Sequence, residues 1–183
     1  MKNYNKMKEL FEKSNDNFLS QQIKLIESRV SERTLCGQLM LYLNEEKNKT
    51  EYWKYYVDVE YNRNFHRKVK TIKNSEEEII RINCDLILHS RGENLIQDNL
   101  IAIEMKKSNS SNINKEKDKE RLKALTKHSF DNVWSYDGKS LPKNVCRYIL
   151  GVYYEFNISR GKVLLEYYMD GQLKEKDFIV LYK

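Results

Sequence analysis

Two carboxylates and an ammonium group have the types and the spacing that suggest chemistry in this chain. Asp85 lies in one segment of alternating apolar residues, and Glu104-Met105-Lys106 ends the next. Side chains alternate along a strand, so Glu104 and Lys106 point to the same face. If the two strands pair as a hairpin, Asp85 faces that side too. We therefore expect these three charged groups to converge on one face of a sheet.

Charges at such a position need each other, a metal or a substrate, because burying an unpaired charge is costly. The set suits hydrolysis of a phosphodiester. Two carboxylates hold Mg²⁺, a hard cation that prefers oxygen ligands and keeps several waters. The metal neutralises the phosphate and lowers the pKa of a bound water, while a lysine orients that water or stabilises the developing charge. Glu32, early in a predicted helix, offers a third carboxylate.

The E-x-K spacing by itself is a weak signal. It occurs a second time at Glu45-Glu46-Lys47, in a charged stretch that ends a predicted helix and reads as solvated surface. The copy at Glu104 differs because it ends an apolar strand and follows Asp85 across a predicted hairpin. The structural alternative is an ion pair at the end of a strand, either Glu104 with Lys106 or Asp85 with Arg81.

Helices and strands alternate along the chain. Apolar spacing predicts one or two amphipathic helices over 4–29, a second segment over 32–46 with Ser31 as its N-cap, and a charged helix over 115–127. A period of two predicts strands over 55–61, 80–88 and 100–106. An apolar and aromatic strand over 147–156, buried on both faces, and a hairpin with its turn at Asp170-Gly171 follow. Three strands, a helical crossover and a buried strand predict an α/β fold with a mixed central sheet flanked by helices.

Composition limits the class of protein. The chain has 183 residues, with 33 Lys and Arg against 27 Asp and Glu, a formal net charge of +6. We expect one domain with no membrane segment and no signal peptide. Three cysteines are far apart and form no zinc-ligand spacing with the histidines, which predicts free buried thiols in a reducing cytoplasm.

Five sequence blocks resemble one known group of enzymes. They read V-S-E-R-T-L at 30–35, V-D-V-E-Y-N-R at 57–63, D-L-I-L-H-S-R-G at 85–92, N-L-I-A-I-E-M-K-K-S at 99–108 and D-K-E-R-L-K-A-L-T at 118–126. In this order they resemble small, stand-alone, largely uncharacterised bacterial members of the PD-(D/E)XK nuclease superfamily, which has the restriction-endonuclease-like fold. The likeness runs from Val30 to Phe156, about two-thirds of the chain.

The resemblance implies a fold and a set of roles. It implies an αβββαβ core over 30–156, with an N-terminal helical extension over 1–29 and a C-terminal β-hairpin over 157–183. Asp85 and Glu104 are then metal ligands and Lys106 the catalytic lysine. Glu32 matches a helical acidic residue beside the metal, and Gln38 lines the same cleft. Cys84 replaces the proline that many members place before the aspartate.

Further residues are candidates for contacts around this site, each beside a structural alternative. Glu60 would reach the cleft and Arg63 would grip a phosphate, or both lie on an edge strand as a surface ion pair. Asp118 and Arg121 are adjacent on one helix face, so Arg121 either meets the metal cleft or a phosphate, or forms a surface ion pair.

Most of the net charge lies beside the candidate site. Residues 106–128 hold eight Lys and Arg against three Asp and Glu. This basic segment, which includes Lys107 and Lys115, is a candidate phosphate-backbone footprint or a solvated helix face. The tyrosine pairs 153–154 and 167–168 either stack bases or place one ring in the core and one on a sheet face.

We expect a Mg²⁺-dependent nuclease, with Mn²⁺ as a substitute metal and DNA as the favoured substrate. A chain of this length leaves little room for a separate recognition domain. A homodimer, or a partner subunit in a bacterial defence or mobile-element system, would then supply specificity. The alternative is a catalytically silent module of the same fold that binds nucleic acid or a protein partner.

Overall fold

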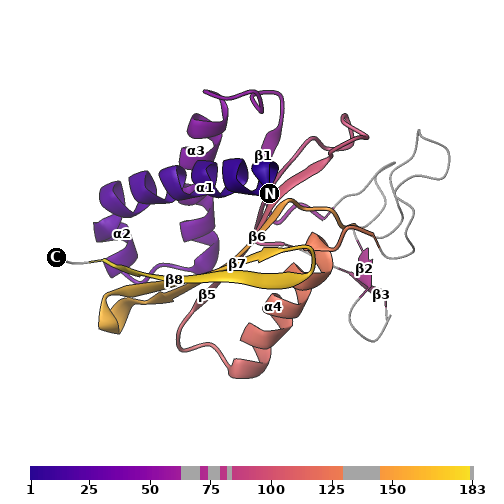
Figure 1. The fold of residues 1–183 in the computed structure, drawn as a ribbon. Coiled ribbons are helices and arrows are strands. Elements are labelled where there is room, and N and C mark those ends of the chain that lie inside the picture. The colour runs from indigo at the N-terminus through magenta and orange to yellow at the C-terminus, as the bar shows by residue number, and fades with distance from the viewer. Residues whose placement is uncertain (63–70, 74–78, 82–83, 130–144, 182–183) are drawn as a thin grey trace.

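A six-stranded sheet forms the centre of the computed structural model, which describes residues 1–62, 71–73, 79–81, 84–129 and 145–181 (Figure 1). Its strands, in spatial order, are β1 (Tyr56–Val59), β4 (Leu86–His89), β5 (Asn99–Lys107), β6 (Leu150–Asn157), β7 (Lys162–Met169) and β8 (Gln172–Val180). Neighbouring strands are antiparallel except β5 and β6, which are parallel. The predicted α/β class with a mixed sheet between helices is confirmed.

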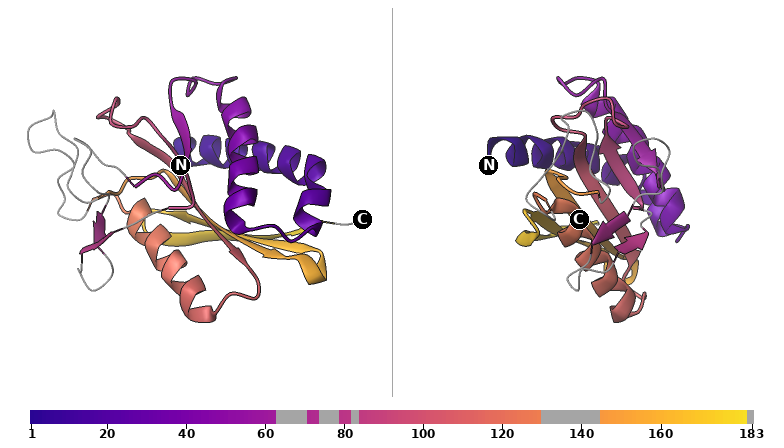
Figure 2. Two further views of the ribbon diagram at one scale, coloured as in Figure 1. Left: turned by 180° about the vertical axis from the view of Figure 1, so that it is seen from behind. Right: turned by 90° about the vertical axis from the view of Figure 1, so that its right-hand side faces the viewer.

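Helices cover both faces of the sheet (Figure 2). One face carries α1 (Lys2–Gln21), α2 (Ile23–Glu27) and α3 (Glu32–Lys47), and the other carries α4 (Asn112–Thr126). The side chains of β5 divide between the two layers. Ile101, Ile103 and Met105 belong to the core under α1 and α3, whereas Ala102 packs with residues of α4. Glu104 and Lys106 therefore project toward the α4 side, which is the side that bears the candidate site.

The N-terminal helical segment belongs to the main core. Met7, Phe11 and Phe18 of α1 are fully buried in the same cluster as the strands. The predicted helical region is divided at Gln22, where α1 ends and α2 begins. The predicted cap of α3 is confirmed, because the hydroxyl of Ser31 accepts a hydrogen bond from the backbone N–H of Thr34.

The expected continuous strand over 80–88 is wrong. β3 (Ile79–Arg81) pairs with β2 (Thr71–Lys73) in a separate two-stranded sheet, and β4 begins only at Leu86. Asp85 thus lies just before β4. The carboxylate of Asp85 accepts a hydrogen bond from the backbone N–H of Met105 at 2.8 Å. If the strand were continuous, a backbone carbonyl of that strand would accept this hydrogen bond instead. The apolar alternation predicted both pieces but gave no sign of the break between them.

The C-terminal hairpin is confirmed. Met169 pairs with Gln172, and Asp170 and Gly171 form the turn with φ of 52° and 75°. Positive φ at both central residues is the type I′ arrangement, which matches the twist of the flanking strands. The Cβ that an alanine would add at Gly171 would lie 3.1 Å from Lys127 Cγ, so the hairpin tip packs closely on the end of α4.

Base stacking on the paired tyrosines is excluded by their burial. The rings of Tyr153, Tyr154, Tyr167 and Tyr168 are at most 1% exposed. Because helices cover both faces of the sheet, alternate residues of β6 and β7 all point into a core, and neither ring of a pair reaches solvent. The prediction that β6 is buried on both faces is confirmed, but the expected exposed tyrosine of each pair is not.

The sequence analysis made one prediction about the cysteine thiols and one about membrane-spanning segments. Cys36, Cys84 and Cys146 are all buried and form no disulfide bond, as predicted. Among the residues that the structure describes, no helix is both long and apolar enough to cross a membrane.

Candidate active site

The site lies where β5 extends beyond its neighbour β4. Leu86, the first residue of β4, pairs with Ile103, but β5 continues to Lys107. Two carboxylates accept hydrogen bonds from backbone N–H groups of β5 beyond the end of β4. Asp85 Oδ2 accepts the N–H of Met105, and Glu32 Oε1, from the first turn of α3, accepts the N–H of Lys107, each at 2.8 Å. The part of β5 that has no partner in β4 therefore holds both carboxylates beside the strand.

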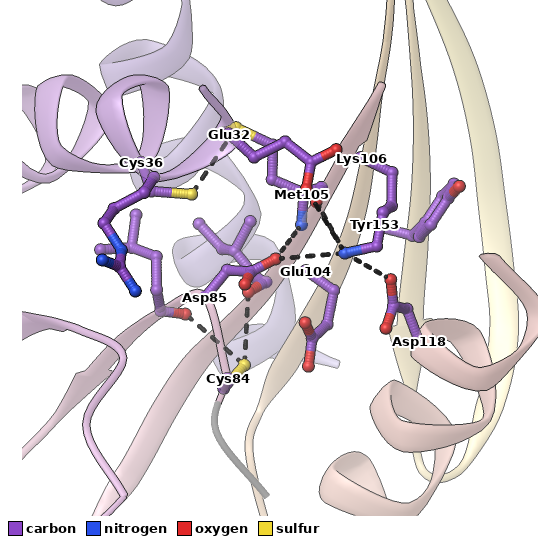
Figure 3. Close-up of polar contacts among 12 residues, drawn as sticks. Glu32, Cys36, Cys84, Asp85, Glu104, Met105, Lys106, Asp118 and Tyr153 are labelled. Carbon is purple, nitrogen blue, oxygen red and sulfur yellow. Dashed lines mark hydrogen bonds and ion pairs between the residues drawn. The ribbon is translucent and has the colours of Figure 1, made fainter. Parts of the chain in front are cut away.

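Lys106 lies at the centre of the acidic groups (Figure 3). Its ammonium is 2.9 Å from Asp118 Oδ2, 3.7 Å from Glu32 Oε2 and 3.9 Å from Asp85 Oδ2. Burial lowers the pKa of Lys106, but the close carboxylate of Asp118 and the charge of Asp85 outweigh it, so the pKa lies above its ordinary value. Lys106 is therefore an ammonium ion across the neutral range.

Glu104 is the most deeply buried carboxylate of the site, with 1% of its side chain exposed. Continuing the strand register by one residue sets it opposite Asp85. Burial raises the pKa of Glu104 well above its ordinary value, although the guanidinium of Arg121, 2.7 Å away, acts in the opposite direction. Burial also raises the pKa of Asp85. For both carboxyl groups, the neighbouring positive charges thus do not fully offset the cost of burying the ionised form.

The cluster as a whole has an excess of negative charge. With all four carboxyl groups ionised, those of Glu32, Asp85, Glu104 and Asp118 outnumber the two cationic groups of Lys106 and Arg121 by two charges. Glu104 Oε1, Asp118 Oδ2 and Arg121 Nε are buried without an aligned hydrogen bond. Oxygen ligands and an uncompensated double charge fit a hard divalent cation such as Mg²⁺.

The number of protein ligands available to such a cation is small. Within the described part of the chain, no three His, Cys, Asp or Glu side chains are arranged to hold a metal together. A cation here would rest on Asp85 and Glu104, with water completing its coordination. Mg²⁺ is commonly bound in this way, through one or two carboxylates. Glu32 instead contacts the backbone of Lys107 and the ammonium of Lys106.

The side chains of two other predicted residues have no described contact with this cluster, and a third residue cannot be placed. Gln38 is half-buried in α3, and none of the described hydrogen bonds joins it to the four central residues. The carboxylate of Glu60 forms a bidentate pair with Arg33, although its backbone N–H donates to the carbonyl of Asp85. Arg63 lies outside the described residues.

The basic segment is largely neutralised within the chain. Lys115 pairs with Glu155 at 3.1 Å, Lys119 with Glu166 at 3.3 Å, and Lys123 with Glu120 at 2.6 Å. The side chain of Lys107 donates to the carbonyl of Arg29. Because α4 packs over acidic residues of β6 and β7, much of its positive charge faces the sheet.

Asp118 is a residue of the site that the sequence analysis placed beside Arg121 on one helix face without assigning it to the site. It is 3% exposed and binds both Lys106 and Arg121. The signal that reveals it is its spacing: Asp118, Leu122 and Leu125 lie at i, i+4 and i+7 on α4, so the carboxylate shares the buried stripe of the helix. A charged residue on a buried stripe requires a charged partner, and Lys106 of β5 is that partner.

Comparisons of the chain with protein-family models, with curated proteins and with solved structures found no match.

Proposed function

We propose that the protein is a Mg²⁺-dependent nuclease that hydrolyses phosphodiester bonds, with DNA as the favoured substrate. The observation that carries the proposal is the convergence of Asp85, Glu104 and Lys106 at the open end of β5. The chain order α3, β1, β4, β5, α4, β6 supports it, because this is the αβββαβ order of the restriction-endonuclease-like core that the sequence resembles. The strands β2 and β3 are inserted into that order.

Each central side chain has a role in the proposed reaction. Asp85 and Glu104 would hold the cation, and Mn²⁺ would substitute for Mg²⁺. When bound, the metal neutralises the phosphate and lowers the pKa of a coordinated water. Lys106 stays protonated, so it does not act as a general base. Its ammonium orients the attacking water and stabilises the charge that develops on the phosphate.

The remaining acidic residues position Lys106. Asp118 holds the ammonium from the α4 side at 2.9 Å, and Glu32 approaches it from the α3 side at 3.7 Å. Glu32 also fixes the backbone at Lys107, so the end of β5 is held from both layers. In phosphoryl transfer, a metal and a lysine stabilise the developing charge. The protein scaffold contributes mainly by orienting these groups.

The proposal is tested by cleavage of plasmid DNA and of single-stranded DNA with Mg²⁺ or Mn²⁺. We expect Glu104→Ala to abolish cleavage and Lys106→Met to lower the rate by about 10²-fold or more, because each removes charge stabilisation of the transition state. Lys106→Arg keeps the charge and should retain more activity than Lys106→Met. Equal activity in wild type and Glu104→Ala would show that the cleavage comes from a contaminant.

A silent binding module is the second candidate, and the ion pairs favour it. Arg121 already pairs with Glu104, and Asp118 already pairs with Lys106. A pure binder would hold DNA in a salt-sensitive way with no metal-dependent turnover. Salt titration of DNA binding, run beside the cleavage assay, separates the two candidates.

A further inference from the structure

The contact between Arg121 and Glu104 depends on charge more than on hydrogen-bond geometry. Arg121 Nε lies 2.7 Å from Glu104 Oε1, yet neither atom has an aligned hydrogen bond. The same guanidinium donates to Asp118, one helical turn earlier on α4. Glu104 is almost completely buried, whereas 27% of the Arg121 side chain is exposed. Arg121 therefore bridges the interior of the site and solvent.

A divalent cation on Glu104 would meet this guanidinium at close range. Two positive groups on one buried carboxylate repel each other, and the repulsion is strong where water is excluded. Arg121 would still be tethered to Asp118 after leaving Glu104, so the guanidinium would stay at the mouth of the site. A guanidinium in that position can donate two parallel hydrogen bonds to two oxygens of a phosphodiester.

We propose that Arg121 is a resident counterion of the site, which a divalent cation displaces from Glu104 and which then binds the substrate phosphate. This inference rests on the proposed nuclease function and adds a coupling between metal and phosphate binding. While no metal is bound, Arg121 supplies a positive charge to Glu104. By linkage, Arg121 weakens metal binding in the free protein by the same factor as the metal weakens the ion pair.

The first test is isothermal titration of the full chain with Mn²⁺, without nucleic acid. We expect Arg121→Gln to bind Mn²⁺ about tenfold more tightly than wild type, because one competing charge is removed. Lys123→Gln is the matched control, since it removes one positive charge from the same helix and Lys123 pairs with Glu120. We expect Arg121→Lys and Lys123→Gln to bind Mn²⁺ like wild type. Equal or weaker Mn²⁺ binding by Arg121→Gln overturns the proposal.

The second test uses the unaltered protein and does not depend on the folding of a variant. Arginine side-chain ¹⁵N spectra are recorded during a Mg²⁺ titration, with the Arg121 Nε signal assigned from Arg121→Lys. We expect this signal to shift with metal, while that of Arg33, which pairs with Glu60, stays in place. An Arg121 signal that is unmoved at saturating Mg²⁺ overturns the proposal.

The third test concerns the phosphate. In the cleavage assay at saturating metal, Arg121→Gln should raise KM by about tenfold with a smaller change in kcat, since a contact to the bound substrate is lost. An unchanged KM overturns the second half of the proposal. The two failures are distinguishable: wild type that binds Mn²⁺ but cleaves no DNA overturns the nuclease proposal, whereas wild type that binds Mn²⁺ and cleaves DNA, with Arg121→Gln equal to it in both, overturns only the Arg121 proposal.

Discussion

Ionisation of Glu104 affects the stability of the fold in opposite directions under two interpretations. In a metal-binding site the ionised carboxylate destabilises the metal-free fold, and in a structural ion pair it stabilises the fold. Burial raises the pKa of Glu104, so the folded protein binds this proton more tightly than the unfolded chain does. Ionised Glu104 therefore lowers stability as the pH rises through its raised pKa. In a mere ion pair with Arg121, the ionised form would instead add stability.

We expect Glu104→Gln to melt at a higher temperature than wild type without metal at a pH where Glu104 is ionised, because the neutral amide removes a poorly compensated buried charge. The difference should shrink as the pH falls and wild-type Glu104 takes up its proton. Thermal denaturation across a range of pH measures it. A variant that melts below wild type at the higher pH would favour the ion-pair interpretation and count against the site.

At the scale of elements, α4 determines the site because it supplies both Asp118 and Arg121. Its distance from the sheet depends on Gly151 of β6. A Cβ at this position would lie 3.0 Å from Thr126 Cγ2 and 3.2 Å from Tyr168 Cβ. The absence of a side chain at Gly151 thus lets the C-terminal end of α4 pack directly on β6.

We expect Gly151→Ala to cost about 1–3 kcal/mol of unfolding free energy through overpacking, and to lower activity by shifting α4. Gly37→Ala is the control, because the added Cβ would meet nothing within 4 Å on α3. It should be neutral or stabilise by about 0.5–1 kcal/mol, since alanine is the better helix former. Urea denaturation of both variants measures the contrast, and equal effects would contradict the close approach of α4.

For the whole molecule, the site is a point where three layers meet. Glu32 comes from α3, Asp85 and Glu104 from the β4 end and β5, and Asp118 from α4. A cation bound there links to folding, because the unfolded chain does not bring these carboxylates together. Metal binding is thus expected to stabilise the entire fold rather than one element.

We expect Mg²⁺ at about 100 times its Kd to add about 2.7 kcal/mol to the unfolding free energy of wild type. Glu104→Gln should show little of this effect, and a chelator should reverse it in wild type. Melting temperature as a function of Mg²⁺ concentration provides the measurement. A shift of the same size in both proteins would place the cation elsewhere.

Local patterns were enough to predict several features, because each depends on a few neighbouring residues. The alternation of β5 put Glu104 and Lys106 on one face, Ser31 capped α3, and Asp170-Gly171 formed the turn of the hairpin. These features follow from backbone period, side-chain capping and the φ values that particular residues allow.

Other features arose only from packing between distant elements. The alternation over 80–88 gave no sign of the break before Asp85, and the tyrosines of β6 and β7 are buried because α4 covers the second face of the sheet. The sequence left open whether Asp118 and Arg121 form a surface ion pair or reach the cleft, and the crossover from β5 to β6 carries them onto Lys106 and Glu104. The sequence determines which faces are charged, whereas tertiary packing decides which charges meet, because ion pairing depends on distances across layers that no local period encodes.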